Sequence, residues 1–101
     1  MPASSSSTEQ SGEIVRTLRI VNAKGLHARA AAKFAKLVGE FEAGTVVSKD
    51  GIEVPGDSIM GLMMLGAGPG TIIVVRSNGS DAKSAVEALS NLVANGFGEQ
   101  D

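Results

Sequence analysis

His27 is the residue of this chain whose type and surroundings most directly suggest chemistry. It lies in KGLHARAAAKFAKL, residues 24–37, it is the single histidine of the chain, and Arg29 follows two positions later. A neutral imidazole has a nitrogen lone pair that can accept a phosphoryl group, and a guanidinium binds phosphate oxygens. Taken alone, the pair favours a plain surface histidine or weak helix cap, and the alternative is a phosphohistidine site.

A helix beginning directly after His27 would complete such a site. After the break at Gly25, apolar side chains recur at helical spacing and predict a helix over residues 28–38; they are Phe34, Leu37, Val38 and Phe41. His27 then takes the cap position, beside the unpaired backbone N–H groups of Ala28 and Arg29. These groups bind anions, and the helix dipole disfavours a second positive charge there. The position therefore favours a neutral, nucleophilic imidazole.

Three segments have the patterns of β-strands. Residues 13–22 alternate between apolar and polar side chains, which predicts a half-buried strand. Residues 44–54 contain two short β-branched runs joined at Asp50-Gly51, a dipeptide that suits a tight hairpin turn. Residues 71–77, TIIVVRS, form a nearly continuous apolar run, which predicts a well-covered strand.

Two further helices complete the predicted elements. Asp57 or Ser58 is placed to cap a helix of about two turns, which the Gly/Pro cluster at residues 66–70 ends. Apolar residues recur at helical spacing again from Ala82, and Gly96 supplies the stop. The order β-α-β-β-α-β-α predicts an α+β fold, an open-faced two-layer sandwich of a four-stranded antiparallel sheet with three helices on one face. The other face is expected to be open to solvent or a partner.

Composition narrows the function classes. With 101 residues and 10.2 kDa, the chain is long enough for one domain with a single core. A net charge of −2 and the lack of Lys/Arg runs argue against nucleic acid as a partner, because phosphate-backbone binding needs a dense basic surface. Without cysteine and with one histidine, the chain has no predicted disulfide or metal site.

The first residues differ in composition from the rest of the chain. Residues 1–12 are Ser-rich with few large apolar side chains, so we predict a disordered tail, followed by one domain over residues 13–101. They lack the basic and apolar regions of a secretory signal, and no later stretch is long and apolar enough for membrane insertion. We therefore expect a cytoplasmic location.

Two other patterns carry no predicted chemistry. GAGPG, residues 66–70, lacks the third glycine of a dinucleotide fingerprint and precedes a strand, so it is interpreted as a turn. The scattered carboxylates form no spacing typical of an acid/base pair and are interpreted as solvated surface; they include Glu40, Glu42, Glu87 and Glu99.

The stretch IMGLMML, residues 59–65, contains more apolar side chains than a short helix can bury. Ile59, Leu62 and Leu65 have the spacing of core residues. The remaining methionines, Met60, Met63 and Met64, then stay near the surface, where the adaptable methionine side chain suits contact with several partners.

Two motifs together resemble a known family. GLHARAAAKF and DSIMGLMMLG resemble the motifs G-[IL]-H-A-R-P and [KN]-S-I-M-G-[VL]-M-x-L-G of the HPr family, phosphocarriers of the bacterial phosphoenolpyruvate-dependent sugar phosphotransferase system. The resemblance covers Leu18 to Gly96, and the ending NGFGEQD looks like the nitrogen-related branch of the family.

The resemblance implies roles for individual residues. His27 would accept phosphate on Nδ1 from phosphorylated enzyme I and pass it to an enzyme IIA, and Arg29 would stabilise that phosphate. Ser58 matches the serine that HPr kinase/phosphorylase modifies in some bacteria, although a cap role alone also explains a serine there. Ile59, Met60 and Met63 would form the docking surface for partners. The resemblance further implies a carrier, not an enzyme, that needs no metal or cofactor. A monomer is the default expectation, because the docking surface must stay accessible, and the sequence leaves the oligomeric state open.

The chain departs from the family motifs at two positions. Ala30 replaces the usual proline, which should preserve the helix, since a first-turn proline only removes an N–H that has no helical acceptor. Asp57 stands where Lys or Asn is usual, which bears on recognition by the kinase. Two alternatives to the carrier stay open: an HPr-like signalling module acting by phosphorylation-dependent binding, and a small interaction domain whose methionine surface binds a partner constitutively.

Overall fold

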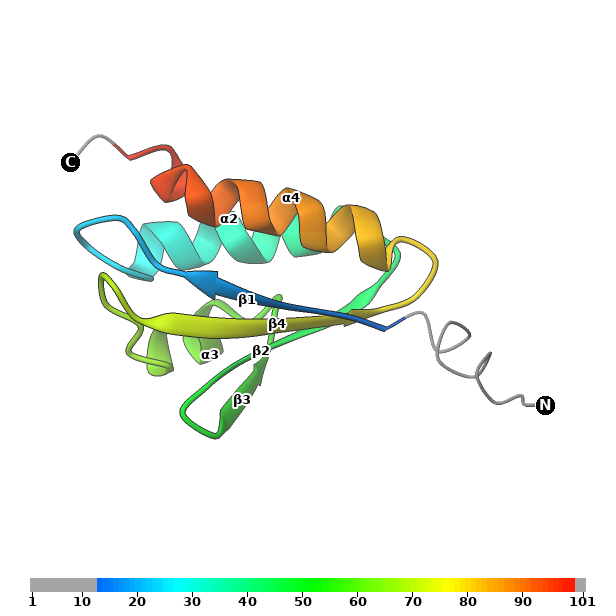
Figure 1. Ribbon diagram of the computed structural model, residues 1–101, viewed down its shortest axis with the longest axis horizontal. Helices are drawn as coiled ribbons and strands as arrows, with labels where there is room; N and C mark the ends of the chain where they lie inside the picture. Colours follow the sequence, from blue (N-terminus) through cyan, green and yellow to red (C-terminus); the bar gives the residue numbers. More distant parts are fainter. Residues whose placement is uncertain (1–12, 100–101) are drawn as a thin grey trace.

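The computed structural model describes residues 13–99, and the predicted tail at residues 1–12 lies outside the described part. The elements follow the predicted order (Figure 1). The strands are β1 (Ile14–Arg19), β2 (Gly44–Lys49), β3 (Ile52–Pro55) and β4 (Ile72–Asn78). The helices are α2 (Ala28–Val38), α3 (Ile59–Met64) and α4 (Ala82–Ala94), followed by a 3-10 turn, η1 (Gly96–Gly98). Among the described residues, no helix has the length and apolar character needed to cross a membrane.

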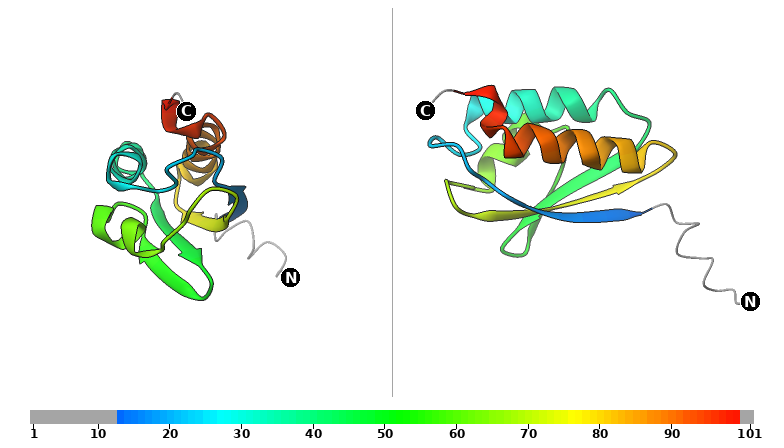
Figure 2. Two further views of the ribbon diagram at one scale, coloured as in Figure 1. Left: turned by 90° about the vertical axis from the view of Figure 1, so that its left-hand side faces the viewer. Right: turned by 45° about the horizontal axis from the view of Figure 1, so that its top comes forward.

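The four strands form one antiparallel sheet in the order β1-β4-β2-β3. The β2–β3 hairpin turns at Asp50 and Gly51, whose φ angles of 53° and 85° are the left-handed values that such a turn requires. Helices α2, α3 and α4 all pack on one face of the sheet, as the end-on view in Figure 2 shows. The predicted two-layer α+β sandwich is confirmed.

The core lies between the sheet and the helices. It is built from the inward-facing side chains of the strands and the apolar faces of α2 and α4, together with residues of α3, η1 and the loop after β1. Its largest fully buried apolar members are Phe34, Phe97, Ile20, Leu62, Ile73, Leu89, Val47, Val75, Val86 and Val93. A core of this kind contributes most of the free energy of folding, because burial removes apolar surface from water. Both α2 and the C-terminal turn η1 contribute to it, through Phe34 and Phe97.

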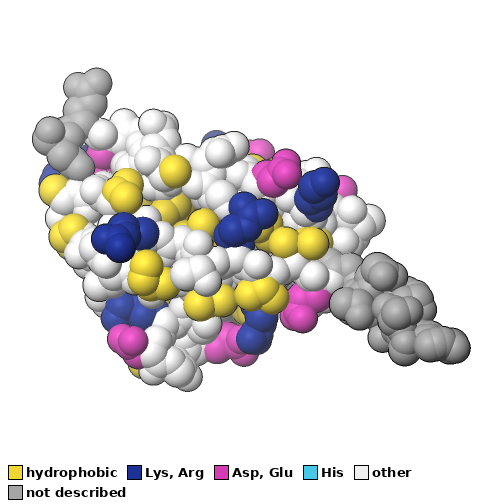
Figure 3. Space-filling model, viewed as in Figure 1, with side chains coloured by type: hydrophobic (Ala, Val, Ile, Leu, Met, Phe, Trp, Pro, Cys, Tyr) yellow, Lys and Arg dark blue, Asp and Glu magenta, His cyan; other side chains and the backbone are white. Residues whose placement is uncertain are grey.

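The outer face of the sheet is open, as predicted. The prediction that β4 is a well-covered strand is correct for only one of its two faces. Burial alternates along β4, so that Ile73 and Val75 are buried while Ile72 is 42% exposed. The continuous apolar run is therefore covered on one face only, because no helix of residues 13–99 packs on the other. Figure 3 shows that face, where hydrophobic side chains lie between Lys and Arg side chains.

Candidate functional site

His27 lies at the start of α2, in the cap position that the helical spacing predicts. Its backbone is extended, with φ −76° and ψ −179°, and its carbonyl oxygen accepts the first helical hydrogen bond from the N–H of Ala31 at 2.8 Å. The imidazole does not cap the helix. The ring is instead turned toward the C-terminal segment, and 26% of the side chain is exposed.

The loop before His27 is anchored against the loop that follows α3. Gly25 has a φ of +65°, and a Cβ atom at this position would lie 2.4 Å from the carbonyl oxygen of Ala67. The same carbonyl accepts a 2.9 Å hydrogen bond from the N–H of Leu26, whose side chain is buried. Only glycine permits this close approach, and the two loops together determine where His27 begins the helix.

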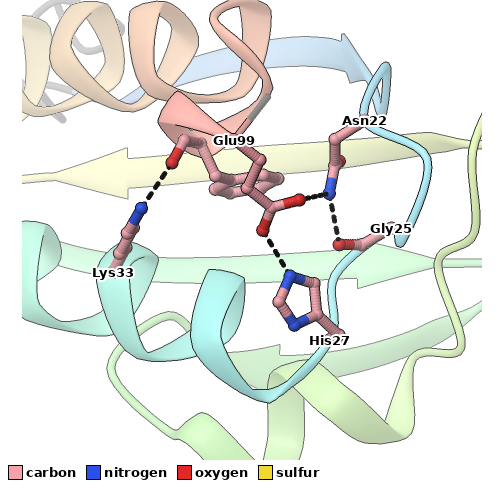
Figure 4. A network of polar contacts seen from close by, with 6 residues as sticks. Asn22, Gly25, His27, Lys33 and Glu99 are labelled. Carbon is pink, nitrogen blue, oxygen red and sulfur yellow. Dashed lines mark hydrogen bonds and ion pairs between the residues drawn. The ribbon is translucent and has the colours of Figure 1, made fainter. Parts of the chain in front are cut away.

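Glu99 is the partner of the His27 ring, which corrects the interpretation of this carboxylate as solvated surface. Its Oε2 forms a hydrogen bond with Nε2 of His27, although the residues are 72 positions apart (Figure 4). Its Oε1 accepts a 2.9 Å bond from Nδ2 of Asn22, which also donates to the carbonyl of Gly25 at 2.8 Å. Sequence reasoning missed Asn22 as well, and the ending NGFGEQD was the only local signal near Glu99.

The C-terminal turn η1 carries Glu99 to this place. Phe97 is fully buried in the core with a φ of 58°, a left-handed value, between two glycines that also have positive φ. Nζ of Lys33 in α2 donates a 2.6 Å hydrogen bond to the carbonyl of Phe97. These contacts hold the chain just before Glu99 against the first turns of α2.

The surroundings of Glu99 favour its charged form. The hydrogen bond from His27 lowers the pKa of this carboxyl from its ordinary value of 4.5, and the hydrogen bond from Asn22 lowers it further. Burial acts in the opposite direction, while the charges of His27 and Lys24 act in the same direction. Glu99 is therefore ionised at neutral pH and acts only as a hydrogen-bond acceptor.

Arg29 and Ala28 lie in the first turn of α2, both exposed. Within residues 13–99 the guanidinium of Arg29 forms no hydrogen bond or ion pair, so no contact joins it to His27. The backbone N–H groups of Ala28 and Arg29 have no acceptor within the helix, because a helix leaves its first amides unpaired. The structure thus leaves a free cation and free amide donors beside the histidine.

The sequence left Asp57 and Ser58 as candidates for the N-cap of α3, and the structure shows that Ser58 is the cap. Its Oγ accepts a 3.0 Å hydrogen bond from the N–H of Gly61, whereas Asp57 is exposed. The serine is partly buried.

The apolar residues of α3 divide between core and surface. Leu62 and Leu65 are buried, as their spacing predicts. Ile59 is 43% exposed, so the core interpretation is wrong for this residue, and Met60 and Met63 are 72% and 44% exposed. We call Ile59, Met60 and Met63 the α3 patch. Because α3 packs against α2, the patch belongs to the helical layer that carries His27.

Comparison with known proteins agrees with this architecture. A sequence model of a family, described as the PTS HPr component phosphorylation site, matches residues 14–95. The chain belongs to the HPr family. It is 45% identical over 84 residues to the phosphocarrier protein HPr of Cupriavidus necator, a match that covers 83% of this chain and 94% of that protein. The phosphocarrier protein HPr of Xylella fastidiosa is 46% identical over 82 residues, with 81% and 92% covered.

A solved HPr structure has the same fold. The crystal structure of HPr-C-His from Thermoanaerobacter tengcongensis aligns with a TM-score of 0.83 at 38% identity, covering 87% of this chain and 99% of that one. The family predicted from the two motifs and the fold predicted from the order of the elements are both confirmed. Membership in the HPr family identifies a phosphocarrier of the phosphotransferase system rather than an enzyme.

The departure from the HPr motif at Ala30 leaves the helix intact. Ala30 is fully buried in the first turn of α2, and the helix begins at Ala28 as predicted. A shallow hollow elsewhere on α2 includes none of the predicted site residues; it is lined by Lys33, Lys36, Leu37, Glu40 and Leu92. Among the residues that the structure describes, no cluster of His, Asp and Glu side chains could hold a metal ion.

Proposed function

We propose that this HPr-family protein accepts a phosphoryl group on His27 from phosphorylated enzyme I and donates it to an enzyme IIA. The observation that carries the proposal is the His27 ring itself. It is partly exposed at the start of α2, its Nε2 is occupied by Glu99, and its Nδ1 has no hydrogen bond among the described residues. A nitrogen that is free and near the surface suits a group that must meet two different partners.

Arg29 and the first-turn amides of α2 supply the electrostatic part of the proposal. A phosphoryl group on His27 would bring negative charge to a helix N-terminus, where the dipole and the unpaired N–H groups of Ala28 and Arg29 favour it. The guanidinium of Arg29 is exposed and has no partner within residues 13–99, so it can turn to the phosphate oxygens.

The α3 patch is the proposed docking surface for enzyme I and enzyme IIA. Its side chains are apolar and exposed, on a helix that packs against α2. Exposed methionines adapt to several partner surfaces, and contact through such a small patch is transient, as a shuttle requires. A double Met60→Ala, Met63→Ala variant should raise the KM for the protein as a substrate of enzyme I, whereas Ile72→Ala, which shortens an exposed apolar side chain on the outer face of the sheet, should not.

Ser58 is the proposed site of regulation by HPr kinase/phosphorylase. Phosphate on its Oγ would add about two negative charges at the start of α3, beside the α3 patch, and weaken docking of enzyme I. With kinase and ATP, mass spectrometry should detect one added phosphate in the wild-type protein and in Ser90→Ala, but none in Ser58→Ala. An unmodified wild-type protein would leave Ser58 as a helix cap only.

The decisive test uses phosphoenolpyruvate and enzyme I, with enzymes from both the sugar and the nitrogen-related branches. Intact mass should increase by one acid-labile phosphate in the wild-type protein and stay unchanged in His27→Ala. Arg29→Ala should slow the transfer about tenfold or more, since hydrogen bonds to charged groups contribute on this scale. Lys36→Ala removes an exposed cation of the same helix and should have no such effect.

Onward transfer separates a carrier from the signalling module of the same family. The purified phosphoprotein should lose its phosphate to an enzyme IIA, which gains it in the same assay. A phosphoprotein that no enzyme IIA can dephosphorylate would contradict the carrier role and favour phosphorylation-dependent binding.

A further inference from the structure

Glu99 is held in a defined position before any phosphate arrives. Asn22 donates to its Oε1, and Asn22 is itself buried and tied to the carbonyl of Gly25. On the other side, the buried Phe97 and its bond from Lys33 fix the turn that precedes Glu99. Figure 4 shows the carboxylate between Asn22 and the His27 ring, with the second ring nitrogen facing away from it.

We propose that Glu99 is a positioning residue for phosphoryl transfer, which holds the proton of His27 on Nε2 so that Nδ1 carries the reactive lone pair. This inference rests on the proposed function of His27. A carboxylate accepts hydrogen bonds and cannot donate them, so the nitrogen that faces it must be the protonated one. In a neutral imidazole the other nitrogen then has the lone pair, and the hydrogen bond also sets the ring orientation.

The proton on Nε2 serves both directions of transfer. In the forward step, the Nδ1 lone pair forms the N–P bond while the bond from phosphorus to the donor nitrogen of enzyme I breaks, and its electron pair returns to that nitrogen. The ring then has a formal positive charge, because Nε2 keeps its proton, and the adjacent Glu99 carboxylate balances that charge. In the onward step a lone pair of the enzyme IIA acceptor group forms its bond to phosphorus while the N–P electron pair returns to Nδ1. The ring then leaves as neutral imidazole instead of the much poorer imidazolate.

The lowered pKa of Glu99 supports this geometry, because it keeps the carboxylate ionised over the whole neutral range. The substitution Glu99→Gln tests whether the carboxylate fixes the tautomer of His27. A glutamine side chain has the same size but only one oxygen. With that oxygen toward Asn22, its NH2 group donates to Nε2; in the flipped orientation the oxygen accepts from Nε2 and the bond from Asn22 is lost. Glu99→Gln therefore removes the bias between the two ring tautomers with little change of shape.

The experiment compares Glu99→Gln with wild type, with Glu99→Asp, and with Glu87→Gln, which removes an exposed carboxylate from α4. Ring nitrogen NMR of the unphosphorylated proteins at about pH 9, where imidazole is neutral, reports the tautomer. The wild-type protein and Glu87→Gln should have the proton on Nε2, and Glu99→Gln should show a mixture. The rate constant for phosphorylation by limiting phospho-enzyme I should fall about tenfold to a hundredfold in Glu99→Gln.

The remaining outcomes decide against the proposal in different ways. Glu99→Asp keeps the carboxylate, so it should retain the Nε2 proton and recover most of the rate even if Glu99→Gln folds poorly. If the Glu99→Gln variant is phosphorylated more slowly but its His27 tautomer is unchanged, Glu99 acts on structure or docking. If the variant is phosphorylated at the wild-type rate, Glu99 has no role in the transfer. Either result overturns the positioning role while the proposed function stands. A wild-type protein that accepts no phosphate overturns the proposed function, and the positioning role with it.

Discussion

At the scale of single residues, the candidate site contains one carboxylate with two hydrogen-bond partners. Glu99 accepts from His27 and Asn22, and both bonds exist only in the folded chain, because the partners lie 72 and 77 positions away. Asn22 is buried with its Oδ1 unpaired among the described residues, so its amide is oriented entirely by what it donates. Burying an unpaired oxygen costs stability, so the two bonds that Asn22 donates must offset this cost.

The lowered pKa of Glu99 predicts how its contribution to stability depends on pH. The folded state holds the proton of this carboxyl less tightly than the unfolded state, so the contribution is fully present above pH 4.5 and is lost as the pH falls through the lower folded value. The difference in unfolding free energy between wild type and Glu99→Gln should therefore shrink as the pH falls below 4.5. Urea unfolding at each pH measures it, and an unchanged difference would contradict the contact with His27 and Asn22.

At the scale of elements, the start of α2 is set by the close approach of two loops. Gly25 and Leu26 lie against Ala67, in the loop that follows α3, so the position of His27 depends on a segment that contains none of the site residues. The C-terminal turn η1 makes the second such contact through Lys33 and Phe97. Helix α2 alone would not fix the position of the His27 imidazole.

Gly25→Ala tests this loop contact, with Gly51→Ala as its matched control. Both glycines have positive φ, so alanine costs about 1–2 kcal/mol of unfolding free energy at either position. At Gly51 the new Cβ meets no atom within 4 Å, whereas at Gly25 it lies 2.4 Å from a backbone oxygen. Gly25→Ala should therefore lose roughly 1–3 kcal/mol more than Gly51→Ala in denaturant unfolding. Equal losses would show that the loops separate without cost.

At the scale of the whole molecule, one core supports every part of the site. The loop that carries Asn22 and Gly25, the start of α2 and the turn η1 meet at the same end of the molecule, as Figure 1 shows. All three are joined to the core, through Ile20, Phe34 and Phe97 respectively. The open sheet face and the exposed α3 patch lie outside this support, so partners can contact the surface without disturbing the core.

Phe34→Ala tests the dependence of the whole molecule on that core. Phe34 is fully buried between the layers, and its truncation should lower the free energy of unfolding by about 3–5 kcal/mol through lost burial and a residual cavity. Met64→Ala, at a side chain that is 74% exposed, should change it by no more than about 0.5 kcal/mol. Denaturant unfolding followed by circular dichroism gives both values, and similar losses in the two variants would contradict a single shared core.

Local patterns in the sequence determined the elements and the predicted reactive residue. Helical spacing predicts α2 with its start at Ala28, Asp50-Gly51 predicts the hairpin, and two short motifs identify the HPr family and its candidate residues, His27 and Ser58. Such signals are readable because spacing, turn preference and capping act between residues close together in the chain.

Tertiary structure alone decided which distant residues complete the site and which surfaces stay open. Glu99 and Asn22 reach His27 because η1 and the loop before α2 pack on one core, and no local pattern links residues so far apart in the chain. The same packing leaves Ile59 and Ile72 exposed, although their apolar side chains favour burial. Hydrophobicity predicts that burial of a side chain is energetically favourable, but only the arrangement of the layers determines which apolar side chains are buried.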